Sequence, residues 1–238
     1  MKKIILFLLL LILLSVGIGY LTLKGNIPFI SERIFKQVDL GINESPEVIY
    51  TYYDEIGFVN NLEGDTPQSG ELIFEGGIDL DHTFTQQEIN SWFSAWEESW
   101  TGIPFKNLQV KLNSDGTVEA SSLISIQEAE SIGKTLGYSQ EEIDKAKSYL
   151  EYIPDPLPLY AKGTISITQD DVQIDMSNFK VANFNVPSTI TSGVAWIVED
   201  VIEKARNMSY ETTINSATVT SEGVKFIGRV PASVSIKE

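Results

Sequence analysis

The 238-residue chain has no cysteine and a single histidine, His82. Without cysteine it forms no disulfide, and it lacks the ligands of the usual zinc sites. The motifs of common catalytic and nucleotide-binding sites are also missing, since no G-x-S-x-G, G-x-G-x-x-G or G-x-x-x-x-G-K-[ST] occurs. The sequence therefore predicts a protein that is not an enzyme and that uses no cofactor.

A metal site built from carboxylates alone is the remaining alternative, because Ca²⁺ prefers oxygen ligands. In the stretch DLDH, Asp79 and Asp81 would lie on one face of a strand, with His82 on the opposite face. No D-x-[DN]-x-[DN]-G loop accompanies them, and a solvated strand face explains the pattern better. We therefore predict no metal site.

Basic residues are scarce, since 17 Lys and Arg stand against 33 Asp and Glu and the net charge is −16. Nucleic acids are bound by clustered Lys and Arg, so the charge balance excludes a nucleic-acid partner. It also opposes docking on anionic lipid headgroups by charge. The simplest role of the excess acid is to keep a folded domain from aggregating.

Charge is absent from residues 4–23, IILFLLLLILLSVGIGYLTL, which follow Lys2 and Lys3. A helix of this length spans about 30 Å, the thickness of the hydrocarbon core of a bilayer. We expect residues 1–24 to be an uncleaved, single-pass transmembrane signal anchor and residues 25–44 to be a stalk. Residues 45–238 would then form a domain outside the cytoplasm, because Lys2 and Lys3 should stay inside. A signal peptide cleaved near Ser15-Val16-Gly17 is the alternative.

Aromatic side chains concentrate in FTQQEINSWFSAWEESW, residues 84–100, which holds three of the four tryptophans. Thr85 and Glu88 have the spacing of a capping box, which predicts that a helix begins there. Five large apolar residues recur at helical spacing and would share one face of this helix. They are Ile89, Trp92, Phe93, Trp96 and Trp100.

Strand patterns surround this helix. Alternating apolar residues predict hairpins that turn at 113–116, 169–171 and 221–223. Helical spacing recurs at 46–56, where Ser45 would be the N-cap, at 126–153 and at 188–208. Ser139 and Glu142 form a second capping box. The sum is an α+β fold: an N-terminal transmembrane helix, then a curved antiparallel sheet covered by long amphipathic helices.

The order of these segments resembles the small membrane-anchored extracytoplasmic domains of the YpmS and LmeA kind, over residues 78–234. The matching positions are Thr85, Glu88, Ile89, Asn90, Gly116, Pro187, Gly223, Gly228 and Pro231. The resemblance implies phospholipid binding in the cell envelope by a long helix against a curved antiparallel sheet. It supplies no catalytic residue.

Large aromatic side chains on one helix face can be plain core or the wall of an apolar crevice, and the same residues can be core at one end and cavity wall at the other. The predicted bilayer nearby and the missing catalytic motifs favour the crevice. We therefore expect a membrane-anchored extracytoplasmic protein of the cell envelope that binds a lipid or another amphiphile. The expected wall is Ile89, Trp92, Phe93, Trp96, Trp100, Phe179, Val181 and Phe184.

Trp196 lies off the apolar face of the last predicted helix, on the side of Glu199 and Glu203. A tryptophan there is either buried by a second layer of structure or exposed, and an exposed one would contact the bilayer interface or another protein. The alternative function is therefore a non-catalytic scaffolding or accessory module that binds another envelope protein. A third alternative, a carboxylate hydrolase, would require two acids that face one cleft.

Overall fold

The computed structural model describes residues 35–62, 70–125, 128–150, 155–169, 171–206 and 212–237. The helices are α3 (Glu47–Ile56), α4 (Gln86–Ser99), α5 (Ala129–Thr135), α6 (Gln140–Leu150) and α7 (Ser188–Arg206). The strands are β1 (Val59–Asn60), β2 (Leu72–Glu75), β3 (Ile78–Phe84), β4 (Phe105–Leu112), β5 (Val118–Ile124), β6 (Leu157–Thr168), β7 (Val172–Val181), β8 (Phe184–Asn185), β9 (Thr213–Val219), β10 (Val224–Val230) and β11 (Ser233–Ile236).

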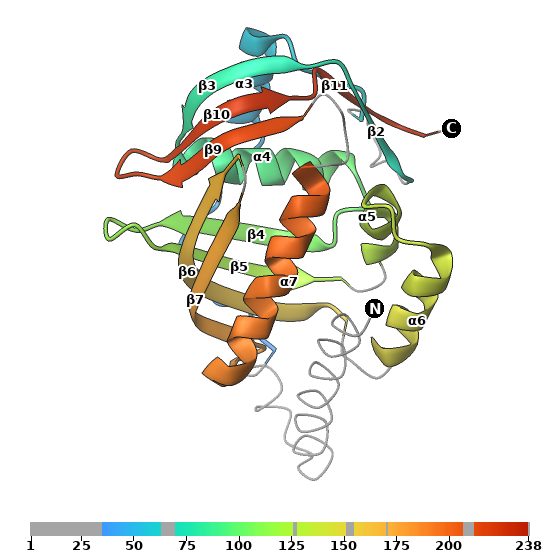
Figure 1. Ribbon diagram of the computed structural model, residues 1–238, viewed down its shortest axis with the longest axis vertical. Helices are drawn as coiled ribbons and strands as arrows, with labels where there is room; N and C mark the ends of the chain where they lie inside the picture. Colours follow the sequence, from blue (N-terminus) through green and yellow to red (C-terminus); the bar gives the residue numbers. More distant parts are fainter. Residues whose placement is uncertain are drawn as a thin grey trace.

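An eight-stranded antiparallel sheet runs in the order β3-β10-β9-β6-β5-β4, and β7 pairs with the other edge of β6 and with β8. Strand β6 pairs with β5 over residues 157–163 and with β9 over residues 166–168. Since β7 occupies its opposite edge, β5 and β9 follow one another along a single edge of β6. The sheet therefore divides into two parts, and Figure 1 shows β3, β10 and β9 above α4, with β4 and β5 below it.

Bulges help the sheet to bend around α4. The β6–β7 register shifts at Gly163 and the β9–β10 register shifts at Gly228. A Cβ atom at Gly163 would lie 2.1 Å from the carbonyl oxygen of Asp175, and one at Gly228 would lie 2.2 Å from that of Thr213. Only glycine permits such a close approach of two strands, which is why it stands at both bulges.

Helix α4 begins as its sequence predicts. The backbone N–H of Glu88 donates to Thr85 Oγ1 over 3.2 Å, and the N–H of Thr85 donates to Glu88 Oε2 over 2.7 Å. These two bonds complete the capping box and satisfy donors that the first helical turn would leave unpaired. The second predicted box is also confirmed, since Ser139 and Glu142 exchange the same pair of bonds before α6.

Replacing Thr85 by alanine should lower the free energy of unfolding by about 1 kcal/mol, because the Glu88 N–H loses its side-chain acceptor. Thr85→Ser keeps the hydroxyl and should cost less than half of that amount. Urea denaturation of both variants measures the difference. Equal losses for alanine and serine would show that the hydroxyl does not stabilise the helix start.

The polar face of α4 holds the edge strand β4. Asn90 Oδ1 accepts from the N–H of Val110 and Asn90 Nδ2 donates to the carbonyl of Val110, each over 2.7 Å. Gln86 Oε1 accepts from the N–H of Leu112 over 2.9 Å. Side chains on one face of α4 thus form the backbone hydrogen bonds that a neighbouring strand would otherwise form with β4. These bonds also fix the position of α4 relative to the sheet.

Among the described residues, three groups of buried side chains form the core. One joins α7 to β6 and β7 through Leu157, Phe179, Val181, Val186 and Val194. A second joins the three-stranded sheet β1-β11-β2 to the end of α4 through Leu62, Leu72, Trp100, Ile103 and Val234. The third packs α3 on α4 through Ile49, Tyr53 and Ala95.

The fold prediction is wrong as stated, because it began with a transmembrane helix. In the ranges that the structure describes, no helix has both the length and the apolar character needed to cross a membrane, and the predicted span 4–23 lies outside those ranges. The structure shows an α+β fold with a mostly antiparallel sheet and few helices; the β1–β11 pair is parallel.

Within the helical region predicted over 126–153, the described residues form two short helices, α5 and α6, beside the sheet (Figure 1), and α6 begins at the predicted capping box of Ser139 and Glu142. Residues 136–139 separate them, and Gly137 takes a left-handed φ of 78° that ends α5. The sheet is covered chiefly by α4 and α7.

The described end of the predicted stalk lies against the sheet. Gln37 Nε2 donates to the carbonyls of Asn107 and Ser121, and Ser121 Oγ donates to the carbonyl of Val38. Residues 35–44 therefore belong to the packed body of the domain at β4 and β5.

Candidate functional site

A cavity of about 660 Å³ lies between α4 and the two parts of the large sheet. In the described part of the chain its lining is apolar apart from the Glu88 carboxylate and two tyrosine hydroxyls, and it comes from α3, α4, α7 and strands of both parts. The lining residues are Ile49, Tyr52, Tyr53, Ile56, Phe58, Phe74, Leu80, Phe84, Glu88, Ile89, Trp92, Phe93, Trp96, Val110, Leu112, Val118, Ile165, Ile167, Ile202, Ala217, Val219, Val224, Phe226, Val230 and Pro231.

The size of this cavity is that of a ligand site, since pockets for small molecules measure about 300–1,000 Å³. An apolar cavity of about 150 Å³ already holds a benzene ring. By that measure the space between α4 and the sheet accepts about two dozen carbon atoms. It is therefore large enough for the hydrocarbon part of a lipid.

The tryptophans of α4 line the cavity one above another along the helix. The ring centroids of Trp92 and Trp96 are 5.6 Å apart with the planes at 61°, and Phe74 of β2 adds a ring 6.4 Å from Trp96. Trp92 is 39% exposed, although it lies on the apolar face. Protein atoms therefore leave a large part of this ring uncovered, as a contact surface for a ligand requires.

One polar corner interrupts the apolar lining at the start of α4. The side chain of Glu88 is only 15% exposed, and its Oε1 lies 3.1 Å from His82 Nε2. Glu88 Oε2 accepts from the N–H of Thr85 over 2.7 Å and from the Thr85 hydroxyl over 2.8 Å. Burial alone would raise the pKa of Glu88, but the hydrogen bonds from Thr85 and His82 outweigh it and lower the pKa. The carboxylate is therefore ionised at neutral pH.

Aromatic rings surround this corner. His82 stacks on Tyr52 of α3 with ring centroids 4.4 Å apart, and Phe84 meets His82 edge-on at 4.7 Å. Burial raises the pKa of the Tyr52 phenol, and the negative charges of Glu88 and Glu55 raise it further. Tyr52 is therefore neutral at physiological pH and keeps its hydroxyl proton.

Some residues of the predicted wall line the cavity and others do not. Ile89, Trp92, Phe93 and Trp96 line the cavity together, since they follow one face of α4. Trp100 is the C-cap residue with extended backbone, so it leaves the helical face. It is 1% exposed, and its indole N–H donates to the carbonyl of Gly70 over 3.1 Å in a different part of the core.

The three wall residues predicted on strands are not among those that line the cavity. Phe179 and Val181 of β7 are 5% and 2% exposed and pack against Val194 of α7, on the other side of the sheet. Phe184 is half-buried in the short strand β8, which pairs with β7. Strand alternation indicates that such residues are buried, but it does not distinguish two faces that are both covered.

Sequence reasoning missed the strand side of the cavity. Val110, Leu112 and Val118 come from β4 and β5, while Ala217, Val219 and Phe226 come from β9 and β10. Their alternation along each strand is visible in the sequence. What joins them is the pairing of β9 with the far end of β6, a long-range contact that no local pattern contains.

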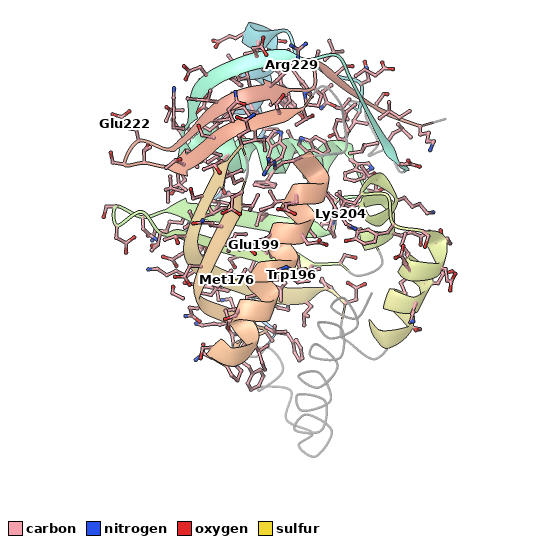
Figure 2. All side chains as sticks on the ribbon, viewed as in Figure 1. Met176, Trp196, Glu199, Lys204, Glu222 and Arg229 are labelled. Carbon is pink, nitrogen blue, oxygen red and sulfur yellow. The ribbon has the colours of Figure 1, made fainter. Side chains whose placement is uncertain are left out.

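Trp196, the predicted partner contact, is half-buried on α7. Figure 2 shows it on the helix near Glu199, where α7 crosses β7. Glu199 Oε1 accepts from the N–H of Ile174 over 2.9 Å and so ties the helix to the strand. A role for Trp196 in contacting another protein stays a prediction.

A second, polar cleft of about 580 Å³ lies beyond the polar face of α4, between residues 36–44 and β4. Its lining includes Asn107, whose φ is 49°, and Glu97, whose Oε2 accepts from the N–H of Asn107 over 2.8 Å. Asparagine tolerates this left-handed backbone conformation, which arises because β4 has a bulge at this point.

Neither metal ligands nor known relatives identify the site. In the described ranges no group of three or more His, Asp or Glu residues is placed to hold a metal ion. Asp79 and Asp81 instead point away from the cavity and pair with Arg229 and Lys225 of β10. Compared with models of protein families, with curated proteins and with solved structures, the chain shows no match. The resemblance to the YpmS and LmeA domains stays a prediction.

Proposed function

We propose that this protein binds the hydrocarbon part of an amphiphile, a lipid or a lipid-linked envelope precursor, non-covalently in the cavity beneath α4. The observation that supports it is the lining: 25 residues of the described part of the chain surround about 660 Å³, and only Glu88 among these is charged. A site in the cell envelope, outside the cytoplasm, is part of this proposal and rests on the N-terminal sequence alone.

The energetics favour a hydrocarbon occupant. Each methylene group moved from water into an apolar site contributes about 0.8 kcal/mol, so a twelve-carbon chain contributes about 10 kcal/mol in total. The loss of translational and rotational freedom on binding costs about 4–15 kcal/mol. Chains of about twelve carbons are therefore the shortest that should bind at useful concentrations.

Affinity should rise about fourfold for each methylene added to an alkyl ligand until the cavity is full, because 0.8 kcal/mol corresponds to that factor. The fluorescence of Trp92 and Trp96 reports binding, since both rings line the space. Titrating the full-length chain with straight-chain alcohols of increasing length measures the increment. Native mass spectrometry of the purified chain should in addition reveal a retained amphiphile. Fluorescence that no alkyl chain of any length changes would contradict the function.

A further inference from the structure

The polar corner of the cavity constrains the chemistry of the ligand's polar end. It lies at Glu88, in the first turn of α4, and the apolar lining continues past Ile89 and Trp92 to Trp96. Eight residues of helix separate Glu88 from Trp96, which corresponds to about 12 Å along the axis. An extended chain beside α4 would therefore have one end at a carboxylate and the other among aromatic rings.

A count of its hydrogen bonds leaves Glu88 one acceptor position for a further donor. An ionised carboxylate accepts at about four lone-pair positions and donates at none. The N–H and hydroxyl of Thr85 occupy two positions on Oε2, and His82 occupies one on Oε1. The position that is left on Oε1 fits a hydroxyl or an ammonium group, whereas a second carboxylate or a phosphate would be repelled.

No lysine or arginine of the described residues offsets this charge from the cavity lining. Lys225 and Arg229, on the strand nearest to His82, pair with Asp81 and Asp79 on the opposite face of the sheet. An anionic group that entered would therefore meet the Glu88 carboxylate, apolar side chains and the hydroxyls of Tyr52 and Tyr53, but no lysine or arginine of the described residues.

On the basis of the proposed function, we propose that the ligand's inner polar end is a hydrogen-bond donor without negative charge, an alcohol or an amine, and that it lies beside Glu88. Fatty acids and phosphate groups are disfavoured at this position. A phospholipid would enter with its acyl chains and leave its phosphate outside the cavity. Glu88 is thus the residue that selects among headgroups, while the aromatic wall selects for hydrocarbon.

The test compares three probes of equal length on the full-length chain: ω-bromododecanol, ω-bromododecylamine and ω-bromododecanoic acid. Bromine quenches nearby tryptophan, and Trp92 and Trp96 line the site. The amine and the acid are both charged, so both lose hydration when they enter the cavity. The ratio of their Kd values therefore reports which sign of charge the site prefers. The acid should have a Kd at least about tenfold above that of the amine at neutral pH.

Glu88→Gln should reduce this ratio to about threefold or less, because the amide keeps an acceptor for Thr85 but carries no charge. Glu98→Gln is the matched control, because it removes the same charge from an exposed position on the same helix. In this variant the ratio of the acid Kd to the amine Kd should equal that of the unmodified protein. Thermal unfolding confirms that both variants are folded.

The outcomes separate the two proposals. An acid that binds as tightly as the amine, or a ratio that survives Glu88→Gln, would overturn the assignment to Glu88 and leave the hydrocarbon site intact. Saturable quenching by the amine and alcohol with weak quenching by the acid supports it. If none of the three probes quenches tryptophan, the proposed function itself fails, and the headgroup assignment fails with it.

Discussion

Replacing Asn90 by leucine should lower the free energy of unfolding by about 2–4 kcal/mol, which corresponds to a fall of about 5–15 °C in melting temperature. Asn90 is 3% exposed and bonds both the N–H and the carbonyl of Val110. Leucine has a similar size, so the substitution leaves no void. It removes the partners of a backbone donor and acceptor beneath α4, and each such group costs about 1–3 kcal/mol when unpaired.

Ser94→Ala is the control for this experiment. Ser94 lies one turn further along the same polar face of α4 and lines the polar cleft, and its loss should change stability by less than about 0.5 kcal/mol. Urea denaturation followed by circular dichroism gives both values. Similar small effects for the two variants would mean that Asn90 does not hold β4, and that the helix keeps its place by apolar packing alone.

Asn90 also shows which features of the fold local sequence patterns can predict and which they cannot. The capping box at Thr85 and the spacing of Ile89, Trp92 and Trp96 predict the start and the apolar face of α4, because both depend on neighbours within two turns. In the sequence, Asn90 is marked only as one of the positions that resemble the YpmS and LmeA domains. Its bond to Val110 joins residues twenty positions apart, and a helix that completes a strand edge leaves no periodic signature.

The limits of the predicted site have equally specific causes. Trp100 continues the helical spacing in the sequence, yet the backbone there is extended with φ −136° and ψ 119°. Gly102 and Pro104, two and four positions later, favour an early end of the helix. Phe179 and Val181 alternate as a buried strand should, but α7 covers their face of the sheet. Choosing the correct face requires the strand order, which depends on contacts distant in sequence.

Filling the cavity from the strand side should abolish ligand binding without unfolding the protein. Ala217 of β9 lines the space, and its neighbours across the sheet, Phe226 and Ile167, line it too. Ala217→Phe therefore directs a ring into vacant apolar space. We expect the Kd of a dodecyl ligand to rise at least about tenfold. The free energy of unfolding should stay the same or increase by about 1–2 kcal/mol, since the new ring is buried.

Thr218→Phe provides the matched control, because Thr218 is the next residue of β9 and is exposed on the opposite face. It adds the same ring outside the cavity and should leave ligand affinity unchanged. Unaltered binding by Ala217→Phe would place the hydrocarbon elsewhere, whereas a loss of more than about 2 kcal/mol in stability would show overpacking of a site that is already filled. Tight binding by the control together with weak binding by Ala217→Phe ties the ligand to the space beneath α4, because the two variants differ only in the face that receives the ring.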